Sequence, residues 1–344
     1  TGMSESGEPS RGITRMSDVV GQSSVAASPF VIARHRVVIE FRTSGRLVPW
    51  LGPAFRGITA LRYRAASCTQ PRETWTSTWR YCRGCPHMST CGYGLVFEPD
   101  AVASEGARDA PRPLVIAPEF PVSQRATAGQ QVHLDIITIG AAAGATVPGV
   151  LRALVDAGRF DGLGPDRVRF NVVFDQEPPL RTAIDPALLP KEASPLPVVR
   201  NVTLRLSSPL FLRERGGNGN RRQILRPTLE NLFQASMRVA REFLGEAALC
   251  PGRGHLDLDD LAGAIEPTLG SVEPFTQDKA SHRSRDRFRL EGVTGAWSFA
   301  WLPACLVPWL QLGGLLHVGG HRIAGAGGWG LTFDAPEPPA GGSP

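Results

Sequence analysis

A proline-rich segment divides this chain into two parts of similar length. Residues 176–197 contain six prolines and no sustained apolar periodicity. Proline lacks a backbone N–H and disfavours helical geometry in the residue before it, so such a segment does not suit the interior of a helix or a sheet. We therefore predict a linker at residues 177–200, between an N-terminal domain at 30–176 and a C-terminal domain at 201–333.

The N-terminal part alternates segments typical of strands with segments typical of helices. In the strand-like segments apolar residues recur at every second position, as in VHLDIITI at residues 132–139. The second helix is marked by Pro148 at its start and Gly158 after its end. The predicted elements are a strand at 36–42, a helix at 55–67, a strand at 132–139, a helix at 148–157 and a strand at 168–174.

The C-terminal part repeats this rhythm. Thr228 can cap a helix whose apolar residues fall near one face and which ends at Gly245. Two successive units of this kind predict an α+β protein of tandem ferredoxin-like (RRM-like) domains with a C-terminal glycine-rich loop. Such domains are common in RNA-binding proteins, although a fold alone does not define a function. The remaining predicted elements are strands at 202–206, 288–290 and 297–301 and a short apolar helix or turn at 305–312, interrupted by Pro308.

The sequence lacks the features of a membrane or secreted protein. No run approaches the roughly 18 to 20 apolar residues that a membrane-spanning helix needs. Residues 1–29 show no charged-then-apolar signal pattern, so we expect a cytoplasmic protein. We also predict that residues 1–29 and the Pro- and Gly-rich residues 334–344 are disordered.

Arginine supplies nearly all of the positive charge. The formal net charge is +5, and only Lys191 and Lys279 among the 37 basic residues are lysines. GC-rich coding would explain this preference without any function. Recognition of phosphate would explain it too, because a guanidinium grips phosphate oxygens with two donors. The arginines concentrate in residues 34–64, 205–241 and 283–289, and this clustering favours a polyanionic partner.

Two glycine-rich loops could bring backbone amides and arginines to a phosphate. Glycine reaches positive φ and lets the backbone approach a ligand, and successive free N–H groups can hold an anion. For both loops the alternative is a surface loop without a ligand. The candidate phosphate-binding residues are Gly319, Arg322, Gly325 and Gly327 in the loop at 317–330, Arg213, Arg215, Arg221 and Arg222 around the loop at 216–222, and Arg46, Arg283 and Arg285 in the other basic clusters.

Four cysteines lie close together in the sequence: Cys68, Cys82, Cys85 and Cys91. A Cys-x-x-Cys turn places two sulfurs on one metal ion, and two further cysteines complete a tetrahedral zinc site. His87 could replace one of the four. Free or loosely paired thiols and an iron–sulfur cluster are the alternatives, and structural zinc is the interpretation we favour.

The most specific local motif is His317-Val-Gly319, followed by Gly325-Ala-Gly327. Other short motifs precede it in a fixed order. In this order the motifs resemble the CRISPR-associated endoribonucleases of the RAMP superfamily, which process precursor CRISPR RNA (crRNA), over about residues 35–333. The preceding motifs are FRG at 55–57, CGYGLVFE at 91–98, SSPL at 207–210, SHRSR at 281–285 and LEGVTG at 290–295.

The resemblance implies binding of a CRISPR repeat RNA and its cleavage without a catalytic cofactor. In that reaction the 2′-OH upstream of the scissile phosphate attacks it, leaving a 2′,3′-cyclic phosphate and a 5′-OH. The resemblance also implies that the protein stays on its product and joins other CRISPR effector subunits. A related possibility is a RAMP subunit that binds crRNA in an effector complex without cutting it.

The family often places its general base, a histidine, in the first helix or the loop before it. Residues 43–67 contain no histidine. Arginine is a poor base, but it can stabilise the charge of the transition state, and a tyrosine can relay a proton. The candidate catalytic residues are therefore His35, Arg56, Arg62, Tyr63 and His321.

Overall fold

A computed structural model describes residues 30–70, 82, 85–87, 90–99, 111–174, 177–194, 197–215, 221–245, 258–280 and 287–333. The two ends predicted to be disordered lie outside these residues, as do Arg283, Arg285 and most of the loop at 216–222. Arg215 and Arg221 are described by their backbone only. No helix among the described residues is long and apolar enough to cross a membrane.

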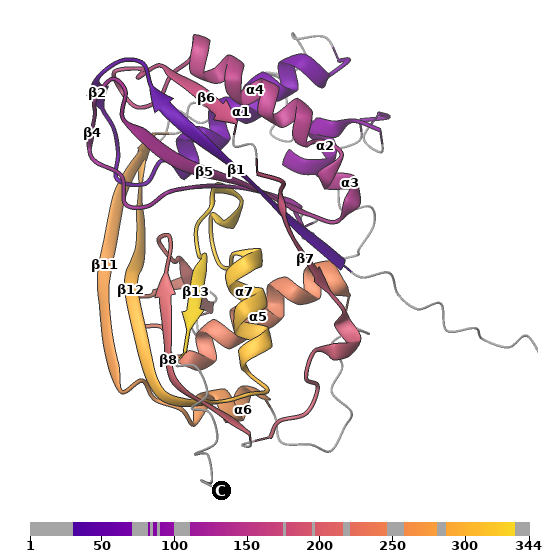
Figure 1. Cartoon of the computed structure of the whole chain (residues 1–344), viewed down its shortest axis with the longest axis vertical. Coiled ribbons are helices and arrows are strands. Elements are labelled where there is room, and N and C mark those ends of the chain that lie inside the picture. The colour runs from indigo at the N-terminus through magenta and orange to yellow at the C-terminus, as the bar shows by residue number, and fades with distance from the viewer. Residues whose placement is uncertain are drawn as a thin grey trace, which may run out of the picture.

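The N-terminal domain is an antiparallel sheet covered on one face by helices (Figure 1). Its strands lie in the order β3-β5-β1-β6. The chain order strand, helix, strand, strand, helix, strand gives a ferredoxin-like fold. The elements are β1 (Phe30–Phe41), α1 (Gly52–Ser67), β3 (Leu114–Pro118), β5 (Gln131–Ile139), α4 (Val147–Phe160) and β6 (Phe170–Phe174), with the short β2 (Gly45–Arg46), α2 (Gly92–Phe97), β4 (Arg125–Ala126) and α3 (Ala141–Gly144).

Side chains along β1 point alternately to the two faces of this sheet, so each face has its own set of contacts. Val37, Ile39 and Phe41 are buried in one apolar core, where they pack with Phe55 of α1 and Leu154 of α4. Residues at even positions point to the opposite face. Helix α1 begins earlier than its predicted start because Pro53 is accepted in the first turn, where the missing N–H has no partner to lose.

The segment predicted as a linker contains a strand of the N-terminal sheet. Strand β7 (Leu180–Ile184) pairs with the first half of β1, from Phe30 to Arg34, and a turn of 3-10 helix, η2 (Pro186–Leu188), follows it. The prolines flank β7 rather than interrupt it, so the strand keeps its hydrogen bonds.

The C-terminal domain repeats the same arrangement, with the strand order β11-β12-β8-β13. The prediction of tandem ferredoxin-like domains is therefore confirmed. The elements are β8 (Val198–Leu206), α5 (Leu229–Leu244), β11 (Leu269–Ala280), β12 (Arg287–Pro303), α7 (Val307–Leu316) and β13 (Trp329–Thr332), with the short β9 (Leu212–Arg215), β10 (Arg221–Ile224), α6 (Leu258–Gly263) and η3 (Arg322–Ala324).

The helix ends of this domain follow from capping chemistry. The hydroxyl of Thr228 accepts a hydrogen bond from the Asn231 backbone N–H, and the Asn231 side chain accepts one from the Thr228 N–H. This reciprocal pair fixes the start of α5, as predicted. The prediction that Pro308 interrupts a helix was wrong, because Pro308 lies in the first turn of α7 and begins it.

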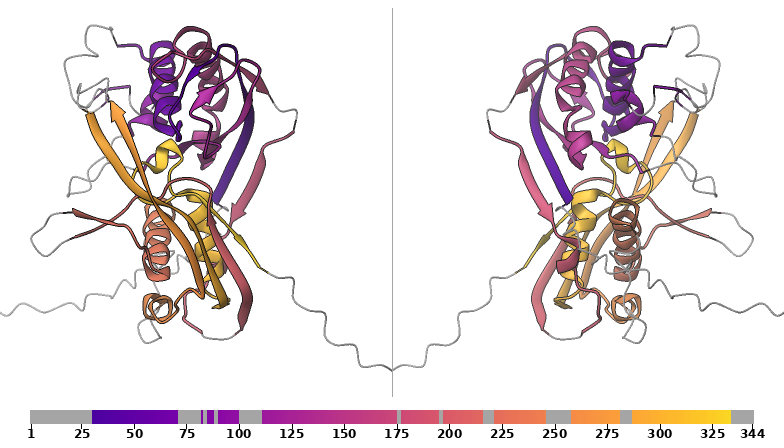
Figure 2. Two further views of the ribbon diagram at one scale, coloured as in Figure 1. Left: turned by 90° about the vertical axis from the view of Figure 1, so that its left-hand side faces the viewer. Right: turned by 90° about the vertical axis from the view of Figure 1, so that its right-hand side faces the viewer.

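The two domains share one apolar core. Ile32, Val115, Ile137 and Ile139 lie on the face of the N-terminal sheet opposite α1 and α4, and they belong to the same buried cluster as Leu232 of α5 and the other C-terminal core residues. The long hairpin of β11 and β12 reaches up to the N-terminal domain (Figures 1 and 2).

Near that end of the hairpin, the buried Gln277 side chain is bonded twice to the backbone of Trp50. Its oxygen accepts from Trp50 N at 3.0 Å, and its amide donates to Trp50 O at 3.0 Å. These contacts hold the two domains in one relative position.

Candidate functional site

The loop after α7 is held in left-handed backbone conformations. Gly319, Gly325 and Gly327 have φ of +77°, +77° and +70°, and His317 and His321 have φ of +58° and +60°. Only glycine adopts such angles without strain, whereas other residues keep them only when their surroundings hold them there. The glycines in the sequence therefore indicate a loop with one defined backbone conformation.

Most of the backbone amides of this loop already have partners. Hydrogen bonds from the N–H groups of residues 318, 320 and 324–328 all end on the loop itself or on residues 208–211. Gly327 N, for example, donates to Pro209 O at 2.9 Å, and Gly320 N donates to Phe211 O at 2.8 Å. These amides are not available to a phosphate, so a ligand at this loop would meet mainly side chains.

The loop is wedged between the two domains. A Cβ added to Gly325 would lie 2.4 Å from Ala117 Cα of β3, and one added to Gly52 at the start of α1 would meet Ala324 O of the loop. The missing side chains of Gly52 and Gly325 therefore let α1, β3 and the loop touch.

His321 lies at this junction, in contact with aromatic rings of both domains. Its ring centroid is 6.4 Å from that of Trp50 and 5.4 Å from that of Phe211, both in edge-on geometry. The side chain is half-buried. The structure thus holds His321 beside the start of α1, at the boundary between the two domains.

His317 is a buried histidine whose importance the sequence did not reveal. Its Nδ1 donates to Ala326 O at 3.1 Å, across the base of the loop. Burial lowers the pKa of His317 to about 4, the hydrogen bond to Ala326 opposes this, and the charge of Arg322 adds to it. A neutral His317 is thus part of the structure that holds the loop closed.

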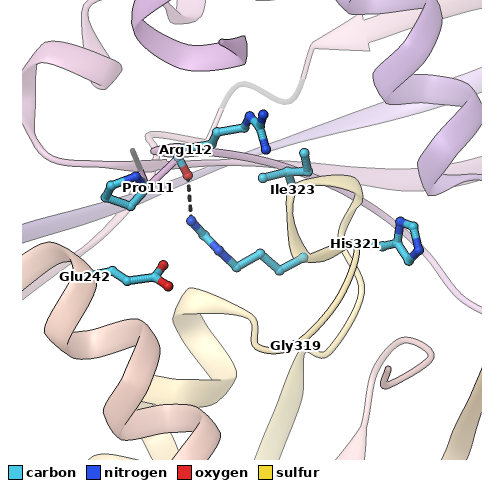
Figure 3. A pocket seen from close by; sticks show the side chains of 7 residues that line it. Pro111, Arg112, Glu242, Gly319, His321 and Ile323 are labelled. Carbon is cyan, nitrogen blue, oxygen red and sulfur yellow. Dashed lines mark hydrogen bonds between the residues drawn. The ribbon is translucent and has the colours of Figure 1, made fainter. Parts of the chain in front are cut away.

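Arg322 belongs to the loop, and its side chain is buried, with 8% of the residue exposed. Its Nη2 donates to Arg112 O at 3.0 Å, and its guanidinium carbon lies 5.0 Å from the centroid of the Phe243 ring. Burial lowers the pKa of Arg322 to about 10, which leaves the group charged at neutral pH. The side chain lines a pocket of about 330 Å³ with Pro111, Arg112, Glu242, Gly319, His321 and Ile323 (Figure 3).

The candidate catalytic residues of α1 face away from this loop. Arg62 makes a bidentate ion pair with Asp161, at 2.6 and 2.8 Å, which ties α1 to the end of α4. Tyr63 is buried, and burial raises its pKa. Its ring fills the space left by Gly92 and Gly149, since a Cβ on Gly149 would lie 2.6 Å from it. The guanidinium carbon of Arg56 lies 5.8 Å from the Phe97 ring centroid.

His35 lies on the helix-covered side of the N-terminal sheet. On β5 it lies directly opposite Ile136, which belongs to the core beneath α1 and α4. Ala117, which contacts the glycine-rich loop, packs on the other face of the sheet, toward the C-terminal domain. Burial lowers the pKa of His35, and the charge of Arg181 adds to this. The sheet thus separates His35 from His321, so the structure does not bring these two histidines together.

The candidate arginines outside the loop are spread over the surface. Arg46 makes a bidentate ion pair with Asp166, whose pKa the hydrogen bonds from Arg46 lower to about 2. Arg213 donates to Gln223 at 3.4 Å, and Arg222 is exposed, both on the β9–β10 hairpin, which Figure 2 shows in salmon projecting from the body. This hairpin and the glycine-rich loop are separate parts of the surface.

The four cysteines lie around the ends of α1 and α2. Cys68 follows α1, Cys91 precedes α2, and Cys85 N donates to Cys82 O at 3.0 Å. Cys82 is buried, and burial raises the pKa of its thiol to about 12. Among the residues that the structure describes, no three His, Cys, Asp or Glu side chains are placed to hold a metal ion, so zinc stays a prediction.

Comparison with known families agrees with the fold and with the place of the loop. Residues 204–329 match the model of the CRISPR-associated endoribonuclease Cas6, and residues 29–180 match a second model, described as an N-terminal domain. The C-terminal domain is therefore a Cas6-like, CRISPR-associated domain. The Cas6 match ends at Trp329 and so includes His321, Arg322 and the three glycines of the loop that have positive φ. No curated protein sequence matches the chain.

Several solved structures are similar to this Cas6-like chain at low sequence identity. A partial Cas6-RT-Cas1–Cas2 complex matches with 11% identity and a TM-score of 0.50, over 91% of this chain and 48% of the other. A Cas6 product complex matches with 15% identity and a TM-score of 0.49, over 89% of this chain and 100% of the other. Cas6 of Thermus thermophilus matches with 14% identity and a TM-score of 0.44, over 88% and 99%.

Proposed function

We propose that this RAMP-type protein binds CRISPR repeat RNA and cuts precursor crRNA by attack of a 2′-OH, without a metal ion. The observation that carries the proposal is the match of residues 204–329 to the Cas6 endoribonuclease model, because this region contains the loop that fixes His321 at the domain boundary. The arginine clusters on the described surface supply the positive charge that an RNA backbone requires.

In this mechanism the half-buried ring of His321 exchanges a proton with the RNA. The attack needs a base for the 2′-OH, an acid for the leaving 5′-oxygen and a cation near the phosphorane. His321 serves as one of the proton carriers, and an arginine serves as the cation. The bidentate pairs of Arg46 and Arg62 with aspartates leave these two less suited to that role than the arginines without such pairs.

A second candidate function is a RAMP subunit that holds crRNA without cutting it. The specific observation in its favour is the state of α1, the helix in which the resemblance places the base. There Tyr63 is buried, Arg62 is paired with Asp161, and no histidine is present. In either case the protein would stay with crRNA and other CRISPR proteins, in keeping with the Cas6-RT-Cas1–Cas2 assembly whose Cas6-containing chain shares its fold.

The test is to incubate the full chain with repeat RNA from an accompanying CRISPR array, in excess EDTA. We expect one specific cut and a 2′,3′-cyclic phosphate on the upstream product. Tight binding of RNA that stays intact would establish the non-cleaving subunit instead. Cleavage that EDTA abolishes would refute the metal-independent mechanism.

Single-residue variants then test whether His321 transfers a proton in the reaction. His321→Ala should slow the cut by at least about a hundredfold, the usual contribution of one acid–base group, while RNA affinity changes little. His133→Ala is the matched control, because His133 is an exposed histidine of the N-terminal sheet, paired with Glu119. Equal rates for the two variants would exclude His321 from proton transfer.

A further inference from the structure

The pocket beneath the glycine-rich loop contains a buried cation with unused hydrogen-bonding capacity. Arg322 Nη1 is fully buried and has no hydrogen-bond partner among the described residues. A buried donor without a partner costs free energy that a ligand can recover. Nη2 of the same guanidinium is already bonded to Arg112 O, shown as the dashed line in Figure 3.

A carboxylate faces the same space from the opposite side. Glu242 projects from the last turn of α5 into the pocket, as Figure 3 shows, and it is exposed at the rim. Its charge raises the pKa of Arg322, yet no ion pair within 4.0 Å joins the two side chains. Nη1 of Arg322 therefore does not use Glu242 as its hydrogen-bond acceptor.

The side chains of this pocket suit a ligand that both accepts and donates hydrogen bonds. The positive charge of Arg322 would attract a phosphate, but Glu242 would repel it at the entrance. The side chain of Arg112 donates to Phe97 O at 2.9 Å. A ligand that accepts from the guanidinium on one edge and donates to the carboxylate on another satisfies both groups at once.

Guanine offers two acceptors on one edge and two donors on the adjacent edge, whereas uracil offers only one donor, N3–H, beside its O4 acceptor. Guanine O6 and N7 accept hydrogen bonds from arginine, while N1–H and the N2 amine can donate to a carboxylate. Adenine has N7 but places an amine where guanine has O6, so the guanidinium would meet a donor. The volume of about 330 Å³ suits one unstacked base, and single-stranded RNA is read through bases of this kind.

We propose that this pocket receives one unpaired guanine of the bound RNA, with Arg322 on its Hoogsteen edge and Glu242 on its Watson–Crick edge. This proposal rests on the proposed binding of RNA. It adds base selectivity at a position on the opposite side of the loop from the His321 ring (Figure 3).

The test uses oligouridines that carry one central guanosine, adenosine, cytidine or uridine, titrated against the full chain by fluorescence anisotropy. We expect the guanosine RNA to bind about tenfold more tightly than the others, the discrimination that one well-placed base contact supplies. Replacement of guanosine by 7-deazaguanosine, which lacks N7, or by inosine, which lacks the N2 amine, should each remove most of this advantage.

Glu242→Ala makes the test specific to the pocket, because Glu242 is exposed and its loss should not prevent folding. In this variant guanosine and inosine RNAs should bind equally, while the loss caused by 7-deazaguanosine remains. Glu266→Ala is the matched control, since Glu266 is an exposed carboxylate just beyond α6. It should keep the full preference for guanosine.

Each other result would overturn the proposal. Equal binding of all four RNAs would leave the RNA-binding function standing and remove the guanine pocket. A guanosine preference unchanged by Glu242→Ala would place selectivity elsewhere. Binding of none of these RNAs would remove the guanine pocket, and failure to bind repeat RNA as well would overturn both proposals. Binding of 5′-GMP as tight as that of the guanosine RNA would make the pocket a free-nucleotide site.

Discussion

Replacement of the buried His317 should change how the stability of the protein depends on pH. We predict that His317→Asn removes a loss of stability that the wild-type protein suffers in mild acid. Asparagine, like histidine, is enriched among the non-glycine residues with positive φ, and its amide can donate to Ala326 O as the ring Nδ1 does. The variant therefore removes the titrating group and preserves the hydrogen bond.

The sign follows from the two protonation equilibria. An unfolded histidine has a pKa near 6.5, whereas burial lowers the folded value to about 4. Between these values the unfolded state binds the proton and the folded state does not, so stability falls as pH falls from about 6.5 to 4. The charges nearest the ring are Arg322, which lowers its pKa, and Asp135, which raises it.

The magnitude is large enough to measure. From these two pKa values, the free energy of unfolding should fall by about 2 kcal/mol between neutral pH and pH 5 on account of His317 alone. Urea unfolding at several pH values gives this quantity, and the difference between wild type and His317→Asn cancels the other titrating groups. His133→Asn, which removes an exposed histidine, is the control. A wild-type-minus-variant difference that stays constant with pH would refute the reasoning.

Two other predictions concern the domain junction and the cysteines. Gln277→Ala should lower the free energy of unfolding by about 3 kcal/mol, because it leaves the buried N–H and C=O of Trp50 without partners. The control Gln234→Ala on α5 should lower it by less than about 1 kcal/mol. Similar thermal melting curves for the two variants would contradict this prediction. Elemental analysis of undamaged protein should find close to one zinc ion per chain at the four cysteines, and no metal would reject the site.

Sequence patterns predicted those elements whose signals are local. Helix α5 occupies the predicted residues because Thr228 and Gly245 mark its ends, and β5 follows the alternation of Val132, Leu134 and Ile136. The same holds for the tandem arrangement, since each domain repeats one order of strands and helices. Capping residues and apolar periodicity act within a few residues, so a single sequence displays them.

Elements that depend on distant partners could not be predicted in this way. Strand β12 runs through Gly292 and Gly295 and joins the two strands predicted at 288–290 and 297–301. Both glycines are needed for close approach, because a Cβ on Gly292 would lie 2.6 Å from Leu210 O, and one on Gly295 would meet Ser271 O. Likewise, β7 forms because it can pair with the first half of β1, where Ile184 lies opposite Phe30. The two strands are about 150 residues apart in the sequence, so no local signal predicts the pairing.

For the candidate site, the sequence identified the loop but not the environment of its side chains. The glycines predicted positive φ, and His321 and Arg322 do lie at the domain boundary. The ion pair of Arg62 with Asp161, the burial of Tyr63 and the sheet between His35 and His321 depend on tertiary packing. So does the placement of Arg322 and Glu242 around one pocket, which no spacing in the sequence indicates.

The apolar core that both domains share has a consequence for how the protein is made. During synthesis the N-terminal sheet emerges first, with Ile32, Val115, Ile137 and Ile139 uncovered until α5 and the C-terminal strands arrive. Such a half-finished chain is exposed to aggregation, and neither domain is expected to persist alone after a truncation or a proteolytic cut between them. The two domains should therefore fold and unfold together, as one cooperative unit.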